Sequence, residues 1–121
     1  MPSTDVAIEW SSDQQSLIFT FPPMLTKEAA SAAIEVWDQQ AGKKGREIHL
    51  VWNCSSMKDY EPAARILWQD ALKKHKKKIG DIWLVSGSRV IRTAAKILAM
   101  FVELKIKPVR SMEEVPLPAM A

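Results

Sequence analysis

The N-terminal part of the chain alternates apolar and polar residues in a way that predicts two β-strands. Large apolar side chains occupy every second position in residues 5–10 and again in residues 16–21, which is the pattern of strands with one buried face. A polar run, residues 11–15, separates the two segments, and so short a link favours an antiparallel pair. Pro22 and Pro23 end the second strand because neither can donate a hydrogen bond to a neighbouring strand.

Beyond this pair, apolar residues at helical spacing alternate with short, continuous apolar runs. Thr26 is placed to cap a first helix, and Pro62 suits the first turn of a second, which Gly80 is expected to end. We expect helices over residues 26–41, 61–79 and 88–103, and strands over residues 47–53, 81–86 and 105–110. This β-β-α-β-α-β-α-β order predicts an α/β fold with a mixed, mostly parallel sheet. Right-handed crossovers would place the helices mainly on one face.

Both faces of the predicted sheet carry apolar side chains. The third helix is expected to cover one face with a buried arc: Ile91, Ala94, Ala95, Leu98 and Phe101. The opposite face would expose another apolar group: Ile18, Val51, Trp83 and Val85. If no segment of the chain covers this group, a second copy would, because large apolar patches are seldom left bare. A homodimer is therefore one expectation.

Length and composition are those of a small domain in a reducing compartment. The 121 residues suit one domain, with a core over about residues 5–114 and a flexible, proline-containing tail at 115–121. A single cysteine, Cys54, excludes an intramolecular disulfide and favours a cytoplasmic location. No segment resembles a signal peptide or a membrane-spanning helix, so no membrane association is expected.

The net charge of +3 owes much to a lysine cluster in residues 73–78. These lysines project to different sides of the predicted second helix, as on a solvated surface, and do not form a stripe along one face. Nucleic-acid binding is disfavoured for this reason, because it usually relies on a focused set of phosphate contacts.

Two stretches resemble the STAS domain superfamily, which includes the anti-sigma-factor antagonists. Residues 49–68 (HLVWNCSSMKDYEPAARILW) resemble the STAS strand that ends in a polar turn and leads into the second helix. Residues 82–100 (IWLVSGSRVIRTAAKILAM) resemble the strand and helix that follow. The resemblance covers roughly residues 5–114, and it implies a STAS-like fold and regulation through protein–protein contacts.

The superfamily often controls such contacts by phosphorylating a serine at the start of the second helix, within an Asp-Ser-Ser-Gly pattern. When Asn53 is aligned with the acidic residue at the strand end, Glu61-Pro62-Ala63-Ala64 falls on that pattern. Ala63 then occupies the acceptor position and cannot carry a phosphate. The resemblance therefore does not imply a phospho-switch there, although Ser55 and Ser56 are candidate phosphorylation sites upstream.

Two polar turns follow neighbouring strands at their carboxyl ends, where open α/β sheets place their ligand sites. The expected partner-binding residues come from these turns and from the start of the second helix: Ser55, Ser56, Met57, Tyr60, Glu61, Arg65, Ser86, Gly87, Ser88, Arg89 and Arg92. The second turn leads into a helix N-terminus, which favours anions. A phosphate or nucleotide site is thus an alternative there, although turn and capping chemistry explains the same residues.

Catalysis and metal binding have little support in the residue pattern. Cys54 has no histidine placed to act as its base, so a packed free thiol is the simpler interpretation. His75 shares the buried arc of the second helix, which indicates a core position. No histidines, cysteines or carboxylates stand at metal-ligand spacing. We expect neither an enzyme nor a bound metal or cofactor.

The leading hypothesis is a non-enzymatic regulatory or scaffolding module that binds a protein in bacterial-type signalling. A kinase or a sigma-factor regulator would be such a partner. The alternative is a module that binds a small ligand, either a nucleotide, another anion or a lipid.

Overall fold

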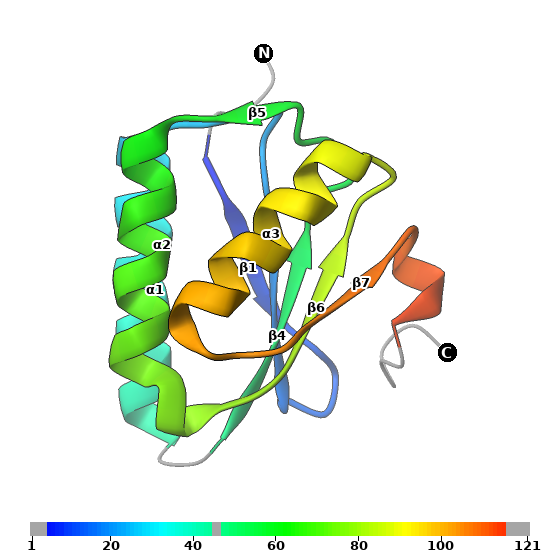
Figure 1. Ribbon diagram of the computed structural model, residues 1–121. Coiled ribbons are helices and arrows are strands. Elements are labelled where there is room, and N and C mark those ends of the chain that lie inside the picture. The colour runs from blue at the N-terminus through cyan, green and yellow to red at the C-terminus, as the bar shows by residue number, and fades with distance from the viewer. Residues whose placement is uncertain (1–4, 45–46, 116–121) are drawn as a thin grey trace.

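A five-stranded sheet lies at the centre of the computed structural model, which describes residues 5–44 and 47–115 (Figure 1). In spatial order its strands are β1 (Ala7–Trp10), β2 (Ser16–Thr20), β4 (Ile48–Asn53), β6 (Ile79–Val85) and β7 (Ile106–Val109). β1 is antiparallel to β2, and the other neighbours are parallel. The mixed, mostly parallel sheet predicted from the sequence is confirmed.

Three helices connect the parallel strands and pack on one face of the sheet (Figure 1). They are α1 (Lys27–Lys44), α2 (Pro62–His75) and α3 (Arg89–Val102). The predicted helix starts at Thr26 and Pro62 are confirmed, because Ala29 N donates to Thr26 Oγ1 at 3.1 Å and Pro62 opens α2. The helices and the sheet enclose the main core, which includes Trp37, Trp68 and Leu98. Within the described residues no helix combines the length and the apolar character needed to cross a membrane.

A small second sheet, which the sequence did not predict, joins the N-terminal ends of α1 and α2. It pairs β3 (Met24–Leu25) with β5 (Asp59–Tyr60) in parallel. Glu61 extends this connection, because its N–H donates to the Leu25 carbonyl at 2.9 Å and its Oε1 accepts from Lys27 N at 2.7 Å. The carboxylate thereby satisfies a free N–H at the start of α1, where negative charge is favourable.

The second helix is shorter than predicted, and Gly80 has a different role. α2 ends at His75, a short 3-10 turn (η1, Lys76–Lys78) follows, and Gly80 lies inside β6. A Cβ atom at Gly80 would lie 2.5 Å from His49 Nδ1, which in turn accepts a hydrogen bond from Asp81 N at 2.8 Å. Glycine is therefore needed for the close approach of the His49 ring, and it does not end the helix as predicted.

The sheet face opposite the helices is covered by the C-terminal end of the described chain. Ile18, Val51 and Val85 form a second buried cluster with Val115, which is 3% exposed. A 3-10 turn (η2, Met112–Glu114) delivers Val115 to this face, and a capping box between Ser111 and Glu114 holds the turn. This cover removes the reason for expecting a homodimer, which stays a prediction. Residues 116–121 of the predicted tail lie outside the described residues.

The two outer strands of the sheet differ in direction and in chemistry. β1 forms one edge and β7 the other. Pro108 lies within β7 opposite Leu84, and the neighbouring Val109 carbonyl accepts a hydrogen bond from Ser86 N at 3.0 Å. Because successive residues of a strand point their backbone groups to opposite sides, the nitrogen of Pro108 faces the open edge.

One core prediction on α3 is wrong. Ile91, Ala95 and Leu98 are buried as expected, but Phe101 is 60% exposed. At 100° per residue, Phe101 lies on the same side of the helix as Val90, roughly 100° from the centre of the buried arc. Its apolar character is therefore not explained by the core of the chain.

Candidate functional site

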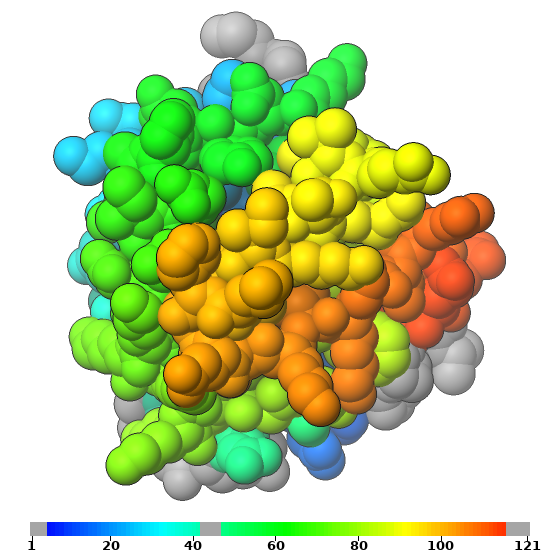
Figure 2. Space-filling model, in the orientation of Figure 1, coloured from blue at the N-terminus to red at the C-terminus, as the bar shows by residue number. Residues whose placement is uncertain are grey.

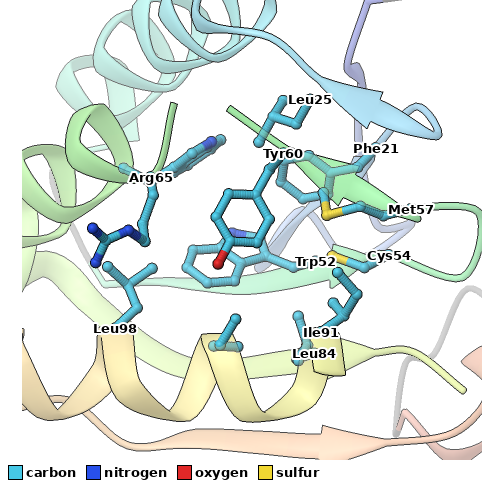
Figure 3. A pocket seen from close by; sticks show the side chains of 13 residues that line it. Phe21, Leu25, Trp52, Cys54, Met57, Tyr60, Arg65, Leu84, Ile91 and Leu98 are labelled. Atoms are coloured by element: carbon cyan, nitrogen blue, oxygen red, sulfur yellow. The ribbon is translucent and has the colours of Figure 1, made fainter. Parts of the chain in front are cut away.

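A pocket opens between α2 and α3 at the carboxyl ends of β4 and β6 (Figure 3). The cavity has a volume of about 70 Å³. Trp52 and Leu84 reach it from the sheet, while Ile91 and Leu98 reach it from α3. It lies where open α/β sheets place their ligand sites, since both strands end at this edge and their loops diverge.

Large aromatic side chains on one side and small residues on the other create this cavity. Trp68 packs in edge-to-face geometry against Phe21 and Trp52, with ring centroids 5.6 and 5.5 Å apart. The side of α3 that faces them carries only Ala94 and Ala95 along the middle of the pocket. Two methyl groups cannot fill the space that the indole rings hold open.

Three of the predicted partner-binding residues lie together at this pocket. Met57, Tyr60 and Arg65 all line it, and Figure 3 shows Tyr60 in the middle of the lining side chains with Arg65 to its left. β5 fixes the backbone at Tyr60, and the first turns of α2 carry Arg65. The fold therefore brings these three residues together in one pocket wall, and their role in partner binding stays a prediction.

The first polar turn is stabilised by its own side chains. Asn53 Oδ1 accepts hydrogen bonds from Ser55 N at 3.2 Å and from Ser55 Oγ at 2.6 Å, which is the geometry of an Asx turn. Ser55 and Ser56 are both exposed. They lie at the surface beside the pocket, and the pocket lining does not include them.

Cys54 is a packed thiol at the end of β4, as the sequence predicts. It is 4% exposed, and its backbone N–H donates to the Val85 carbonyl at 2.8 Å. Burial raises the pKa of the thiol from its ordinary value of 9.0 to about 12, because removal from water disfavours the thiolate. A thiol that stays protonated at neutral pH is a poor nucleophile.

The second polar turn is used to start α3. Ser86 is buried, and its Oγ accepts from Ser88 N at 3.1 Å while its carbonyl accepts from Arg92 Nη1 at 3.0 Å. Ser88 Oγ in turn accepts from Ile91 N at 3.3 Å and caps the helix. Gly87 and Arg89 are exposed and lie outside the pocket lining. Capping chemistry thus engages the side chains of Ser86, Ser88 and Arg92, and the predicted anion site in this turn stays a prediction.

Three polar side chains at the pocket have no partner among the described residues. The indole N–H groups of Trp52 and Trp68 are buried without a hydrogen-bond acceptor. The half-buried Arg65 forms no ion pair with any residue in the described part of the chain. All three groups are hydrogen-bond donors, and Arg65 also brings a positive charge.

The histidines are engaged in structural contacts away from this pocket. The His75 ring packs on Trp37 with centroids 4.7 Å apart, and its Nε2 contacts Asp38 Oδ1. This agrees with the core position predicted from the helical arc. In residues 5–44 and 47–115, no three histidine, cysteine, aspartate or glutamate residues are grouped so that they could hold a metal ion.

The outer surface of α3 is a second candidate site, and the sequence did not predict it. Four large apolar side chains on this surface are exposed, and we call them the α3 outer stripe. They are Val90 (74% exposed), Ile97 (47%), Met100 (77%) and Phe101 (60%). Figure 2 shows α3 lying at the surface of the molecule. The sequence did contain a signal for this surface, because apolar residues occur on more sides of α3 than a single buried face requires.

Comparison with known proteins agrees with this fold. The profile of the SpoIIAA-like family matches residues 16–114, and the chain therefore belongs to that family. An uncharacterized protein with a SpoIIAA-like fold from Shewanella loihica PV-4 has a similar structure, with a TM-score of 0.72 at 15% sequence identity over 94% of this chain and 91% of that chain.

A second solved structure is similar over nearly the same length. The anti-sigma factor antagonist SpoIIAA in its unphosphorylated form matches with a TM-score of 0.69 at 11% identity, covering 90% of this chain and 91% of that chain. No curated protein matches the chain. The STAS-like fold predicted from the sequence is thus confirmed by the family profile and by both structures.

Proposed function

We propose that this chain is a non-enzymatic regulatory module of bacterial-type signalling that acts by binding a protein partner through α3. The α3 outer stripe is the observation that carries the proposal. Four large apolar side chains exposed on one helix are costly to leave in water, and such patches commonly mark protein–protein interfaces. Membership of the SpoIIAA-like family and similarity to an anti-sigma factor antagonist support a role in regulation.

The charges on α3 define the kind of partner. Its ionisable residues are Arg89, Arg92 and Lys96, and the helix carries no acidic residue. A complementary surface would present apolar side chains at its centre and carboxylates at its rim, because interface charges are arranged to complement each other. An acidic, amphipathic helix on a kinase or on a sigma-factor regulator would have this chemistry.

The turns predicted from the sequence would extend this surface. Arg89 lies beside Val90 at the start of the stripe, and Ser55 and Ser56 are exposed at the neighbouring strand end. A phosphate on either serine would add negative charge next to this contact area. The cytoplasmic location expected from the single cysteine fits such a partner.

The test is affinity capture from a lysate of the source organism, followed by reconstitution of the complex from purified proteins. The key variant replaces three stripe residues by serine: Val90→Ser, Ile97→Ser and Phe101→Ser. The matched control replaces two exposed apolar residues on other helices, Val36→Ser and Ile66→Ser. Because all these side chains are exposed, both variants should melt within a few degrees of the wild type.

Support requires a signalling protein that binds the wild type and the control directly but binds the stripe variant at least tenfold more weakly. Equal binding by the stripe variant would refute the use of α3. If the purified wild type instead sediments as a homodimer that the stripe variant dissociates, the stripe serves self-association and the proposed partner is wrong.

A further inference from the structure

We infer that the open edge of β1 binds an extended, basic segment of a partner protein, which adds a strand to the central sheet. This inference goes beyond the proposed contact through α3 and does not depend on it. β1 is an outer strand, and within residues 5–44 and 47–115 no strand pairs with it on the side away from β2. Extended segments commonly bind proteins by pairing with such an edge.

The hydrogen bonds of the β1–β2 hairpin determine which backbone groups face the open edge. Ser11 N donates to the Ser16 carbonyl at 2.9 Å, so the N–H of Ser11 points toward β2. The register pairs Glu9 with Ile18, and backbone groups alternate in direction along a strand. Glu9 therefore points its N–H and C=O toward β2, whereas Ile8 turns both groups outward. An added strand would supply partners for this donor and this acceptor.

The edge of β1 lacks the features that usually prevent pairing. Proteins often protect an outer strand with a proline, which removes a donor, or with a lysine, whose charge repels other chains. The sequence of β1, AIEW, contains neither residue. The backbone of this strand is therefore suited to accept another strand.

The charges around β1 favour a basic segment. Residues 5–26 contain three acidic side chains and no lysine, arginine or histidine, although the whole chain has a net charge of +3. One of the three, Glu9, lies within the edge strand and is exposed. Opposite charges on neighbouring strands stabilise their pairing. A lysine or arginine of the added strand would therefore be favourable beside Glu9.

The same features argue against a second copy of this chain as the added strand. Two paired β1 strands would gather the acidic side chains of both copies at one junction, where like charges repel. The other edge strand, β7, carries the basic Lys107, but Pro108 removes the N–H that it would present to β1. We therefore expect the added strand to come from a different protein.

The side chains on the helix side of β1 favour apolar residues at alternate positions of the partner. Val6, Ile8 and Trp10 pack against the main core but stay partly exposed. Side chains of an added strand would point alternately to the two faces of the sheet. Those on the helix side would cover Ile8, and those on the other side would lie beside Glu9. A fitting segment thus alternates apolar and basic residues.

The experiment measures amide hydrogen exchange by NMR in ¹⁵N-labelled protein, with a synthetic peptide as the probe. The peptide has about six residues, the length of an ordinary strand, alternates lysine with valine, and is acetylated and amidated at its ends. In the free protein the Ile8 amide should exchange much faster than the Glu9 amide, which faces β2. Peptide at about ten times its Kd should slow exchange at Ile8 by about tenfold.

These exchange rates decide whether the edge is open and whether it is used. If the Ile8 amide is already as protected as the Glu9 amide in the free protein, the edge is not open and the inference is overturned. An Ile8 amide that the peptide does not protect would overturn it as well.

Two modified peptides separate strand pairing from attraction between charges. Methylating the backbone nitrogens of the valines removes the donors on one edge of the peptide, and methylating those of the lysines removes the donors on the other. Both peptides keep the same charge, so only the peptide that is methylated on the edge facing β1 should bind at least tenfold more weakly. Loss through valine indicates antiparallel pairing and loss through lysine parallel pairing. Equal affinities of the two peptides would refute strand addition.

Variants of the protein test the charge preference. Glu9→Lys should weaken binding of the lysine–valine peptide by about tenfold and should strengthen binding of a glutamate–valine peptide. Glu35→Lys is the matched control, because it makes the same charge change on the exposed side of α1, and it should bind both peptides as the wild type does. Equal effects of the two variants would mean that the peptide responds only to net charge, which would overturn the assignment to the edge.

The triple serine variant of the α3 outer stripe separates this inference from the proposed function. It should bind the lysine–valine peptide with unchanged affinity, because α3 packs beside β7 and β1 forms the opposite edge of the sheet. Loss of peptide binding in this variant would contradict the placement at β1. A failure of either proposal therefore leaves the other to be judged on its own result.

Discussion

The absence of a side chain at Gly80 leaves room for the ring of His49. The His49 ring occupies the space that a Cβ at Gly80 would need, and its Nδ1 accepts the hydrogen bond from Asp81 N. We expect Gly80→Ala to displace the ring and to reduce the free energy of unfolding by about 1 kcal/mol. Urea denaturation followed by tryptophan fluorescence measures this change.

The same substitution in a His49→Ala background provides the control. Without the ring, an alanine in the strand costs nothing sterically and restricts the unfolded chain, so Gly80→Ala should be neutral or stabilising by about 0.5 kcal/mol. A double-mutant cycle isolates this coupling. If the two effects of Gly80→Ala are equal, the ring contact is not the reason for glycine at this position.

Cys54 gives the stability of the protein a pH dependence in the alkaline range. Its pKa is raised by burial from 9.0 to about 12, so the folded protein holds the thiol proton more tightly than the unfolded chain. This contribution is complete below pH 9 and is lost as pH rises toward 12. We expect stability to fall by about 1 kcal/mol between pH 7 and pH 10 from this group.

The measurement compares urea denaturation of the wild type with that of Cys54→Ala across this range. Lysine and tyrosine titrate in both proteins, so only the difference between the two curves reports on the thiol. The advantage of the wild type should shrink as pH rises above 9. Parallel curves would show that the folded state does not protect the thiol proton.

At the scale of single residues, the sequence predicted burial well where one side of an element is uniformly apolar. Trp68 and Cys54 lie in the core as expected. Phe101 does not, because an apolar residue on a helix is compatible with either the core or an exposed surface, and only the packing of α3 decides between them. The sequence also could not predict that Arg65 forms no ion pair within the described residues, since this depends on which carboxylates the fold brings near.

At the scale of elements, the start of α3 rests on a hydrogen bond from one side chain. Ser88 Oγ accepts from Ile91 N and satisfies a free donor of the first turn. Ser88→Ala should lower the free energy of unfolding by about 1 kcal/mol. Ser88→Asp should keep most of the stabilisation that the cap provides, because aspartate also caps helices. Thermal denaturation of both variants measures the effect, and equal losses would mean that the cap itself is not the cause.

The periodicity of apolar residues was sufficient to predict the main strands and helices, but it did not predict where each of them ends. The alternation of strands with helices was sufficient to predict the parallel sheet. The pairing of β3 with β5 was not visible because each contributes only two residues, too few for a pattern. The end of α2 was missed since the lysines of η1 suit a helix as well as a 3-10 turn.

At the scale of the whole molecule, Val115 closes the second core. It packs on Ile18, Val51 and Val85 after the capped turn η2. Val115→Ala should reduce the free energy of unfolding by about 1–2 kcal/mol through the cavity it leaves. Val115→Asp should do more, because it places a charge against apolar residues and uncovers them.

Two measurements check this prediction. Urea denaturation gives the loss of stability, and sedimentation shows whether Val115→Asp self-associates through the uncovered face. Glu113→Ala is the control, because Glu113 lies in the same turn and is exposed. A fully stable, monomeric Val115→Asp protein would contradict the covering role of this segment.

The candidate site was predicted only in part because it is a property of the assembled layers. The sequence placed Met57 and Tyr60 in the loop after a strand and Arg65 at the start of the second helix, and the fold brings all three to one pocket. The cavity itself depends on Ala94 and Ala95 of α3 facing Trp52 of the sheet and Trp68 of α2. Such a mismatch of sizes between distant segments leaves no local pattern along the chain.

Pro108 has a consequence for how copies of this chain can meet in a concentrated solution. A strand that approached β7 from outside would find no N–H at this position, and the row of backbone donors needed for edge-to-edge growth is interrupted. Edge-to-edge pairing of copies through β7 is therefore disfavoured at Pro108, where an added strand would find one backbone donor fewer.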